Sequence, residues 1–228
     1  MQRRKFTPTL LSIVALGAWS RSWAIGLTET DAASGIRAAL VRGATSAVGL
    51  LGKTDGFLSN PKVHIPLPGF LNDAAKLLRA TGQQKRVDAL ETALNRAAEA
   101  AVPEAKTLLV NAVKSMSVED AKQVLTGGDN SVTQFFIGKT REPLGVKFLP
   151  IVTRATEKVS LVDKYNAVAG KAADFGLLKP QDASIQSYVT EKALDGLYLM
   201  IGEEEKKIRD DPIATGSAIL KKVFGSLK

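Results

Sequence analysis

The chain has 228 residues, of which 45% are hydrophobic and 24% charged, a composition typical of a globular domain rather than a disordered protein. Its formal charge is +8, and Arg3, Arg4, Lys5 and Arg21 fall in the first 24 residues, where there is no acid. The remaining 27 basic residues are interspersed with 23 acidic ones, which excludes a basic stripe for nucleic acid. The absence of cysteine excludes disulfides and thiolate chemistry.

The first 24 residues, MQRRKFTPTLLSIVALGAWSRSWA, have the layout of an export signal peptide. A basic start precedes an apolar run over residues 10–19, and the small residues Ser22 and Ala24 mark a cleavage position. The run is shorter than the roughly 20 residues of a membrane span, so we expect cleavage after Ala24 and no transmembrane anchor afterwards. Arg3 and Arg4 resemble the twin-arginine export motif, and the general secretory route remains open. The mature chain is expected in the bacterial periplasm or outside the cell.

In residues 25–228 the apolar residues recur every three or four positions, which predicts an all-α fold, a single compact domain of about nine or ten helices. Ser117 and Asp120 resemble a capping box at one helix start, and Pro150 is expected to bend or break another helix. The helices are expected at about residues 30–51, 70–82, 83–101, 103–116, 117–125, 132–138, 142–159, 161–173, 183–209 and 210–224.

The stretch NPKVHIPLP, residues 60–68, holds three prolines and the only histidine of the chain. Proline disfavours helix in the residue before it, so this stretch is expected to be an extended connector between helices. Its aliphatic residues Val63, Ile65 and Leu67 then face one side and enter the core, while His64 faces solvent. The alternative makes His64 a proton carrier or metal ligand.

The helix expected at 183–209 is apolar around most of its circumference, as in a helix surrounded by neighbours. Glu191 and Asp195 share its polar face. Two carboxylates so placed can act as an acid and a base or can hold a metal, and more often they simply form the solvated edge of a buried helix. Glu204 falls on the apolar arc, where a carboxylate must be paired or protonated. We expect Arg37 of the first helix as its structural partner, with catalysis by Glu204 as the alternative.

A polar ridge is expected on the helix at 83–101, formed by Asp88, Glu91, Asn95 and Glu99. Such oxygens can bind a hard cation, but acids four residues apart are more often solvated, and we expect solvation here. The chain has no nucleotide-binding glycine motif, no serine nucleophile elbow and no His-Glu-x-x-His motif. We therefore predict no cofactor and no metal site.

Several long stretches resemble, in the same order, an exported bacterial family catalogued as domain of unknown function 4197. These stretches are DGFLSNPKVHIPLP, LNRAAEAA, KSMSVEDAKQVLTGG, ALDGLYLMIGEEEKKIRDDP and LKKVFG, and the resemblance covers nearly all of residues 30–225. It implies a helical single domain in the cell envelope and transfers no reaction, cofactor or site residue. Members of that family often have a lipoprotein cysteine at the cleavage position, which this chain does not share.

Together these observations predict a non-enzymatic exported helical protein that binds an envelope protein or an apolar small molecule. One alternative is a hydrolase or metal-dependent enzyme that uses carboxylates of its central helices, and another is an envelope scaffold without a small ligand. Asn95 and Glu99 are binding candidates beside Arg37 and His64. A concave pocket lined by Glu204 or these residues favours a ligand, whereas an apolar surface patch favours a protein partner.

Overall fold

The computed structural model describes residues 29–157, 159, 162–163, 165–166 and 184–211. These residues form an all-α compact domain without strands. The signal peptide expected at 1–24 and most of the helices expected at 161–173 and 210–224 lie outside the described residues. In chain order the helices are α1 (Glu29–Leu51), the 3-10 turn η1 (Gly69–Leu71), α2 (Asn72–Ala80), α3 (Gln84–Ala101), the 3-10 turn η2 (Val102–Glu104), α4 (Ala105–Lys114), α5 (Val118–Thr126), α6 (Ser131–Thr156) and α8 (Ile185–Asp210).

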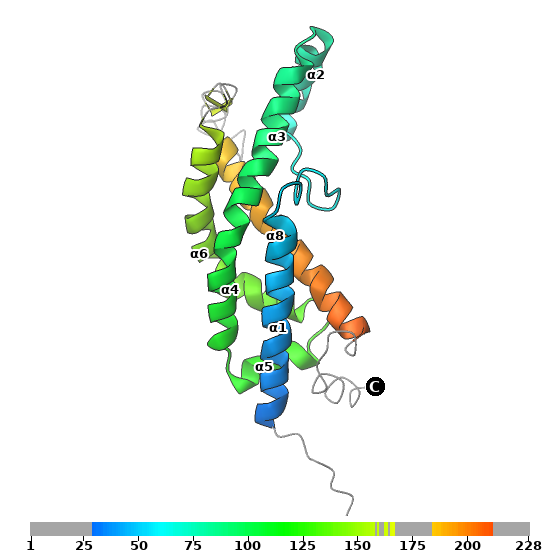
Figure 1. Cartoon of the computed structure of the whole chain (residues 1–228), viewed down its shortest axis with the longest axis vertical. Coiled ribbons are helices and arrows are strands. Elements are labelled where there is room, and N and C mark those ends of the chain that lie inside the picture. The colour runs from blue at the N-terminus through cyan, green and yellow to red at the C-terminus, as the bar shows by residue number, and fades with distance from the viewer. Residues whose placement is uncertain (1–28, 158, 160–161, 164, 167–183, 212–228) are drawn as a thin grey trace, which may run out of the picture.

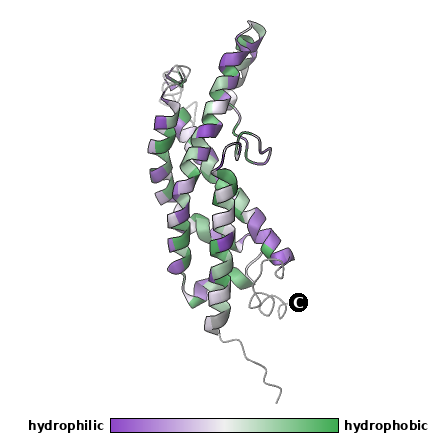
Figure 2. Cartoon of the chain, in the orientation of Figure 1, coloured by the Kyte–Doolittle hydropathy of each residue, from purple (hydrophilic) through white to green (hydrophobic). Residues whose placement is uncertain are grey.

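Helix α8 is the central element, as its apolar circumference predicted. It packs against α6, α1 and α3, and it crosses diagonally behind α3 and α1 (Figure 1). Burial of each large aliphatic side chain stabilises the fold by about 1.5–3 kcal/mol, so this helix holds the bundle together. Its carboxyl end, with the sequence EEEKK, is hydrophilic (Figure 2). The fully or almost fully buried residues of α8 include Ile185, Val189, Ala193, Leu194, Leu197 and Ile201.

Helix α6 is one continuous helix, although the sequence predicted two shorter ones. It passes through Pro143 and Pro150, where each proline removes a backbone hydrogen bond at a cost of about 3 kcal/mol. Every fourth residue of α6 is buried, and Phe136, Leu144 and Phe148 are completely inaccessible to solvent. The burial of these three large side chains offsets the cost of the prolines. The separation expected between residues 138 and 142 was therefore wrong, and of the bend or break expected at Pro150 the break does not occur.

The proline-rich connector begins with a turn and continues without regular structure. The backbone N–H groups of Val63 and His64 both donate to the carbonyl of Asn60, so residues 60–63 are not extended as predicted. The aliphatic side chains nevertheless enter the core as expected: Val63 is 7% exposed, Ile65 1% and Leu67 6%. The segment is a structural connector whose apolar side chains pack into the core beside α8.

Candidate functional site

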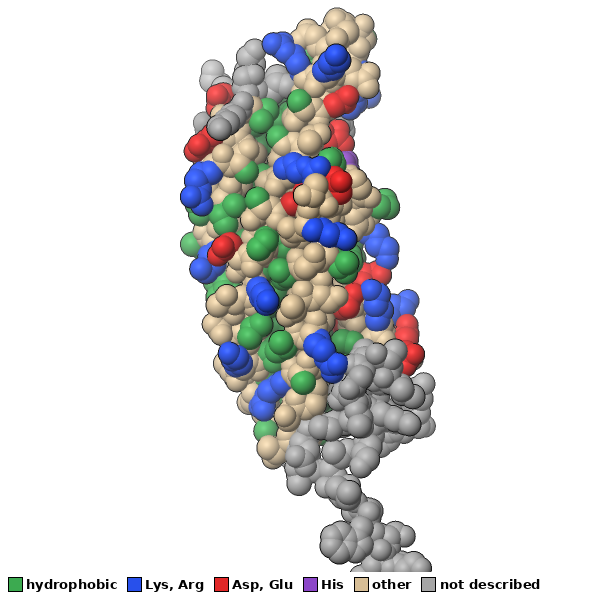
Figure 3. Space-filling model, viewed as in Figure 1, with side chains coloured by type: hydrophobic (Ala, Val, Ile, Leu, Met, Phe, Trp, Pro, Cys, Tyr) green, Lys and Arg blue, Asp and Glu red, His purple; other side chains and the backbone are tan. Residues whose placement is uncertain are grey.

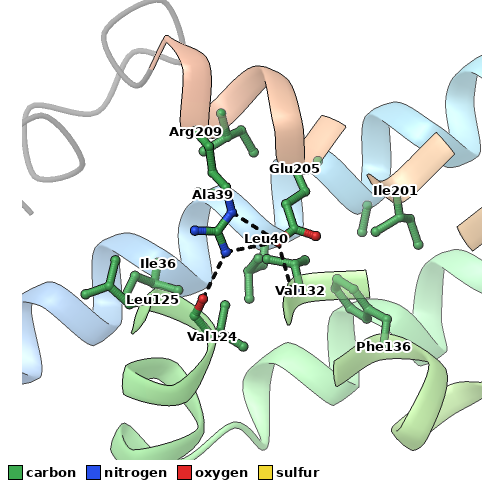
Figure 4. A pocket seen from close by; sticks show the side chains of 13 residues that line it. Ile36, Ala39, Leu40, Val124, Leu125, Val132, Phe136, Ile201, Glu205 and Arg209 are labelled. Atoms are coloured by element: carbon green, nitrogen blue, oxygen red, sulfur yellow. Dashed lines mark hydrogen bonds and ion pairs between the residues drawn. The ribbon is translucent and has the colours of Figure 1, made fainter. Parts of the chain in front are cut away.

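A small apolar cavity lies where α1, α5, α6 and α8 meet. Its volume is about 30 Å³, and Ile36, Leu40, Val124, Phe136 and Ile201 are among its apolar lining residues (Figure 4). A single water needs roughly 10–15 Å³ measured in this way, so the cavity has room for about two or three water-sized groups. A cavity of this size does not accommodate a substrate or a lipid.

The polar wall of this cavity is formed by Glu205 of α8, whose side chain is 1% exposed. Its carboxylate accepts hydrogen bonds from the backbone N–H groups of Val132 and Thr133, each at 3.1 Å, and from the Thr133 hydroxyl at 3.1 Å. These N–H groups belong to the first turn of α6, where they have no partner within the helix. Glu205 therefore caps α6 from another helix, and its negative charge suits the positive end of the helix dipole.

Arg209 completes the network by bonding to Glu205 from one turn further along α8. Its Nε and Nη2 donate to Oε1 of Glu205 at 3.1 and 3.0 Å, and the two side chains point towards each other (Figure 4). Nη2 also donates to the Val124 carbonyl at 3.0 Å and to the Ser131 hydroxyl at 2.6 Å. The network ties the end of α5 to the start of α6, so these charges hold the fold together.

The sequence placed the buried acid one residue too early. Glu204 is not the most buried carboxylate of α8, because its side chain is 14% exposed and accepts a hydrogen bond from the exposed Lys207 at 2.7 Å. The expected pairing with Arg37 was also wrong. Arg37 instead donates to the Met116 carbonyl just beyond α4 at 2.7 Å, and its buried Nε has no partner among the described residues.

Glu191 and Asp195 do share one face of α8, and Arg141 of α6 lies between them. The Nη2 of Arg141 donates to Glu191 at 2.6 Å and to Asp195 at 2.8 Å. Burial lowers the pKa of Arg141, but the hydrogen bonds to Asp195 and Glu191 outweigh that effect and raise its pKa above the usual value. The guanidinium of Arg141 thus occupies the position between the two carboxylates that a metal ion or an exchangeable proton would need.

Asn95 and Glu99 are buried, so the solvated ridge expected on α3 was wrong at these two residues. Asn95 Oδ1 accepts from the N–H of Ile65, and its Nδ2 donates to the carbonyl of Ile65, both at 2.9 Å. Glu99 Oε1 accepts from the N–H groups of Phe57 and Leu58 at 3.0 and 3.1 Å. Both side chains therefore bind the backbone of the segment between α1 and α2 in place of a cation.

His64 is half-buried rather than fully exposed. Its Nε2 lies 3.2 Å from a carboxylate oxygen of Glu91, and the two side chains are 29% and 26% exposed. Arg79 lies 3.8 Å from the other oxygen of Glu91. His64 thus fastens the connector to α3. The described residues contain no group of three or more His, Asp or Glu side chains that could hold a metal ion.

A larger hollow, which we name the α6–α8 groove, was missed by the sequence analysis. It has a volume of about 620 Å³ and is bordered by Gly138, Gly145, Val146 and Leu149 of α6 and by Thr190 of α8. Val146 is 72% exposed and Leu149 is 41% exposed. The Thr190 hydroxyl is buried and has no hydrogen-bond partner among the described residues. Two glycines seven residues apart in a helical stretch were the available signal.

The fold and these sites define an all-α bundle protein whose buried charges bind backbone groups and cap helices. None of the described helices combines the length and apolarity that crossing a membrane requires. The family model described as "Protein of unknown function (DUF4197)" matches residues 26–225, so the chain belongs to that family, as the resemblance predicted. Neither the curated proteins nor the solved structures include a match to the chain.

Proposed function

We propose that the chain is a non-enzymatic protein of the bacterial envelope that binds a protein partner in the α6–α8 groove. One observation carries this proposal. Gly138 and Gly145 leave α6 without side chains at two positions in the groove. In the same groove, Val146 and Leu149 expose apolar surface. Exposed apolar surface next to a hollow is typical of a protein interaction site. Export with cleavage after Ala24 is part of the same proposal.

The packing of the chain itself does not require these glycines. A glycine inside a helix destabilises it by roughly 0.5–1 kcal/mol relative to alanine. Among the described residues, a Cβ atom added at Gly138 would meet nothing within 4 Å, and one added at Gly145 would touch Leu194 at 3.9 Å, an ordinary contact. The missing side chains instead allow another chain to approach the backbone of α6 closely.

The enzymatic alternative is less well supported by the same geometry. A hydrolase needs a carboxylate that can exchange a proton or hold a metal. Glu205 bonds to N–H groups and to Arg209, and the Glu191–Asp195 pair bonds to Arg141. The buried apolar cavity, at about 30 Å³, is far below the roughly 300–1,000 Å³ of ligand pockets. An apolar small molecule held in this cavity is disfavoured for the same reason.

Site-specific photo-crosslinking in the native host tests the proposal. A photoreactive amino acid replaces Val146 in the groove or, as the control, exposed Ala38 on α1, a helix that contributes no residue to the lining of the groove. We expect a discrete crosslinked protein from position 146 and none from position 38. Equal yields at both positions, or no product at position 146, would contradict the proposal.

A further inference from the structure

The hairpin made by α2 and the start of α3, which we name the tip, projects from one end of the bundle (Figure 1). Helix α2 packs mainly against α3 and η1. Gly82, with φ of 77°, occupies the left-handed conformation that glycine tolerates best and so permits the reversal between the two helices. Ala75 is buried and Leu78 is half-buried, so both fasten α2 to the rest of the chain. The tip is therefore a formed structure that, within the described part of the chain, is packed mainly on its own two helices and η1.

The surface of the tip combines positive charge with one protruding leucine. Leu77 is 67% exposed. Four exposed cations lie on the same hairpin, namely Lys76, Arg79, Lys85 and Arg86, and the sequence between Asp73 and Asp88 contains no acid. Lys and Arg side chains gather at this end of the molecule, with acidic side chains nearer to its middle (Figure 3). Helices that lie on a membrane surface combine Lys and Arg with exposed apolar side chains, and the tip offers both, with Leu77 as its exposed apolar residue.

We propose that the tip docks on an anionic lipid surface. Charge complementarity supplies the attraction, because each Lys or Arg near an anionic bilayer strengthens binding about fivefold. Leu77 distinguishes a lipid surface from a purely electrostatic partner. Its side chain is stabilised when it moves from water to the boundary between the lipid headgroups and the acyl chains. Four cations, of which Arg79 also lies 3.8 Å from a carboxylate oxygen of Glu91, and one leucine give a reversible contact rather than an anchor. This inference is independent of the α6–α8 groove, because it involves neither α6 nor α8.

Vesicle co-sedimentation of the chain without its first 24 residues tests this inference. The vesicles contain phosphatidylcholine alone or phosphatidylcholine with anionic phosphatidylglycerol. We expect binding only to the anionic vesicles, weakened by salt. Replacing Lys85 and Arg86 by glutamine should weaken binding about 25-fold, because two cations are lost. Replacing Lys106 and Lys114 of α4 removes the same charge away from the tip and should change binding less than about twofold.

The Leu77→Ser variant separates a membrane from other anionic partners. Leu77 is exposed, so the variant should keep the helical circular dichroism of the parent, while its binding to anionic vesicles should fall at least about fivefold. Undiminished binding by Leu77→Ser, or equal competition by soluble polyglutamate, would assign the tip to an acidic protein and overturn the inference. Absence of binding to anionic vesicles would overturn it as well. So would a loss of binding in the Lys106 and Lys114 control equal to that of the Lys85 and Arg86 variant.

Discussion

Replacing Glu205 by glutamine tests the buried network where α5, α6 and α8 meet. Glutamine has the same shape but no charge, and its amide nitrogen cannot accept a hydrogen bond. One oxygen can still accept from the first turn of α6, but the second acceptor used by Thr133 or Arg209 is lost. The variant thus leaves a buried donor of α6 or a cation without its partner, and does so without creating a cavity.

The expected loss follows from how deeply each partner is buried. Removal of one member of a buried ion pair costs about 3–5 kcal/mol, because the other charge is stranded. The side chain of Glu205 is 1% exposed, but that of Arg209 is 18% exposed and can recover part of its hydration. We therefore expect Glu205→Gln to lower the free energy of unfolding by about 3 kcal/mol, at the lower end of that range.

Urea denaturation followed by circular dichroism measures this loss, and Glu204→Gln is the matched control one residue away. Glu204 has the 63% exposed Lys207 as its partner, so its variant should lose less than about 1 kcal/mol. The Glu205→Gln, Arg209→Met double variant should lose less than the sum of the single variants. Equal losses for Glu204→Gln and Glu205→Gln, or full additivity in the double variant, would refute the proposed network.

Three further variants probe the connector, the contact of Gly196 in α8 with Phe57 in the segment between α1 and α2, and the cap of α5. Ile65→Ala should destabilise the fold by about 2–4 kcal/mol in urea, because a fully buried side chain is lost, and a negligible change would show that the connector is not part of the core. In Gly196→Ala the new Cβ would lie 2.8 Å from the ring of Phe57, so overpacking should cost about 1–3 kcal/mol, and an unchanged urea midpoint would contradict that contact. Hydrogen bonds from the backbone and then the hydroxyl of Ser117 hold the pKa of Asp120 below its usual value, so the stability they add is present at neutral pH and is lost as the pH falls through the depressed pKa. The stability gap between the parent and Asp120→Asn should therefore shrink below about pH 4, and a gap independent of pH would contradict the capping box.

The features that the sequence predicted correctly depend on neighbours in the chain. Proline disfavours helix in the residue before it, so the alternation that buries Ile65 and Leu67 could be predicted, whereas Val63 is buried from within a turn. The capping box of Ser117 and Asp120 uses two residues that are three positions apart, and the structure confirms it. The all-α class followed in the same way from the period of apolar residues.

The features that were missed depend on partners far along the chain. Asn95 looked solvated on the wheel of its own helix, but its partner Ile65 is 30 residues away. Glu205 was passed over for Glu204 because its partners at the start of α6 are more than 70 residues away. Buried backbone donors attract polar side chains that helical periodicity assigns to the surface. The continuity of α6 through Pro150 has a similar origin, because tertiary burial offsets a local penalty.

The most direct test of the proposed partner site fills the α6–α8 groove and leaves the rest of the chain unchanged. Leucine is placed at Gly138 or, as the control, at Gly49 of α1, and a Cβ atom at either position would meet no atom of the described residues within 4 Å. Both variants should unfold in urea at the parental midpoint or above it, because leucine favours helix more than glycine does. The account predicts that Gly138→Leu abolishes the crosslinked product at position 146 and that Gly49→Leu retains it. A product of undiminished yield in the Gly138→Leu variant would contradict the account.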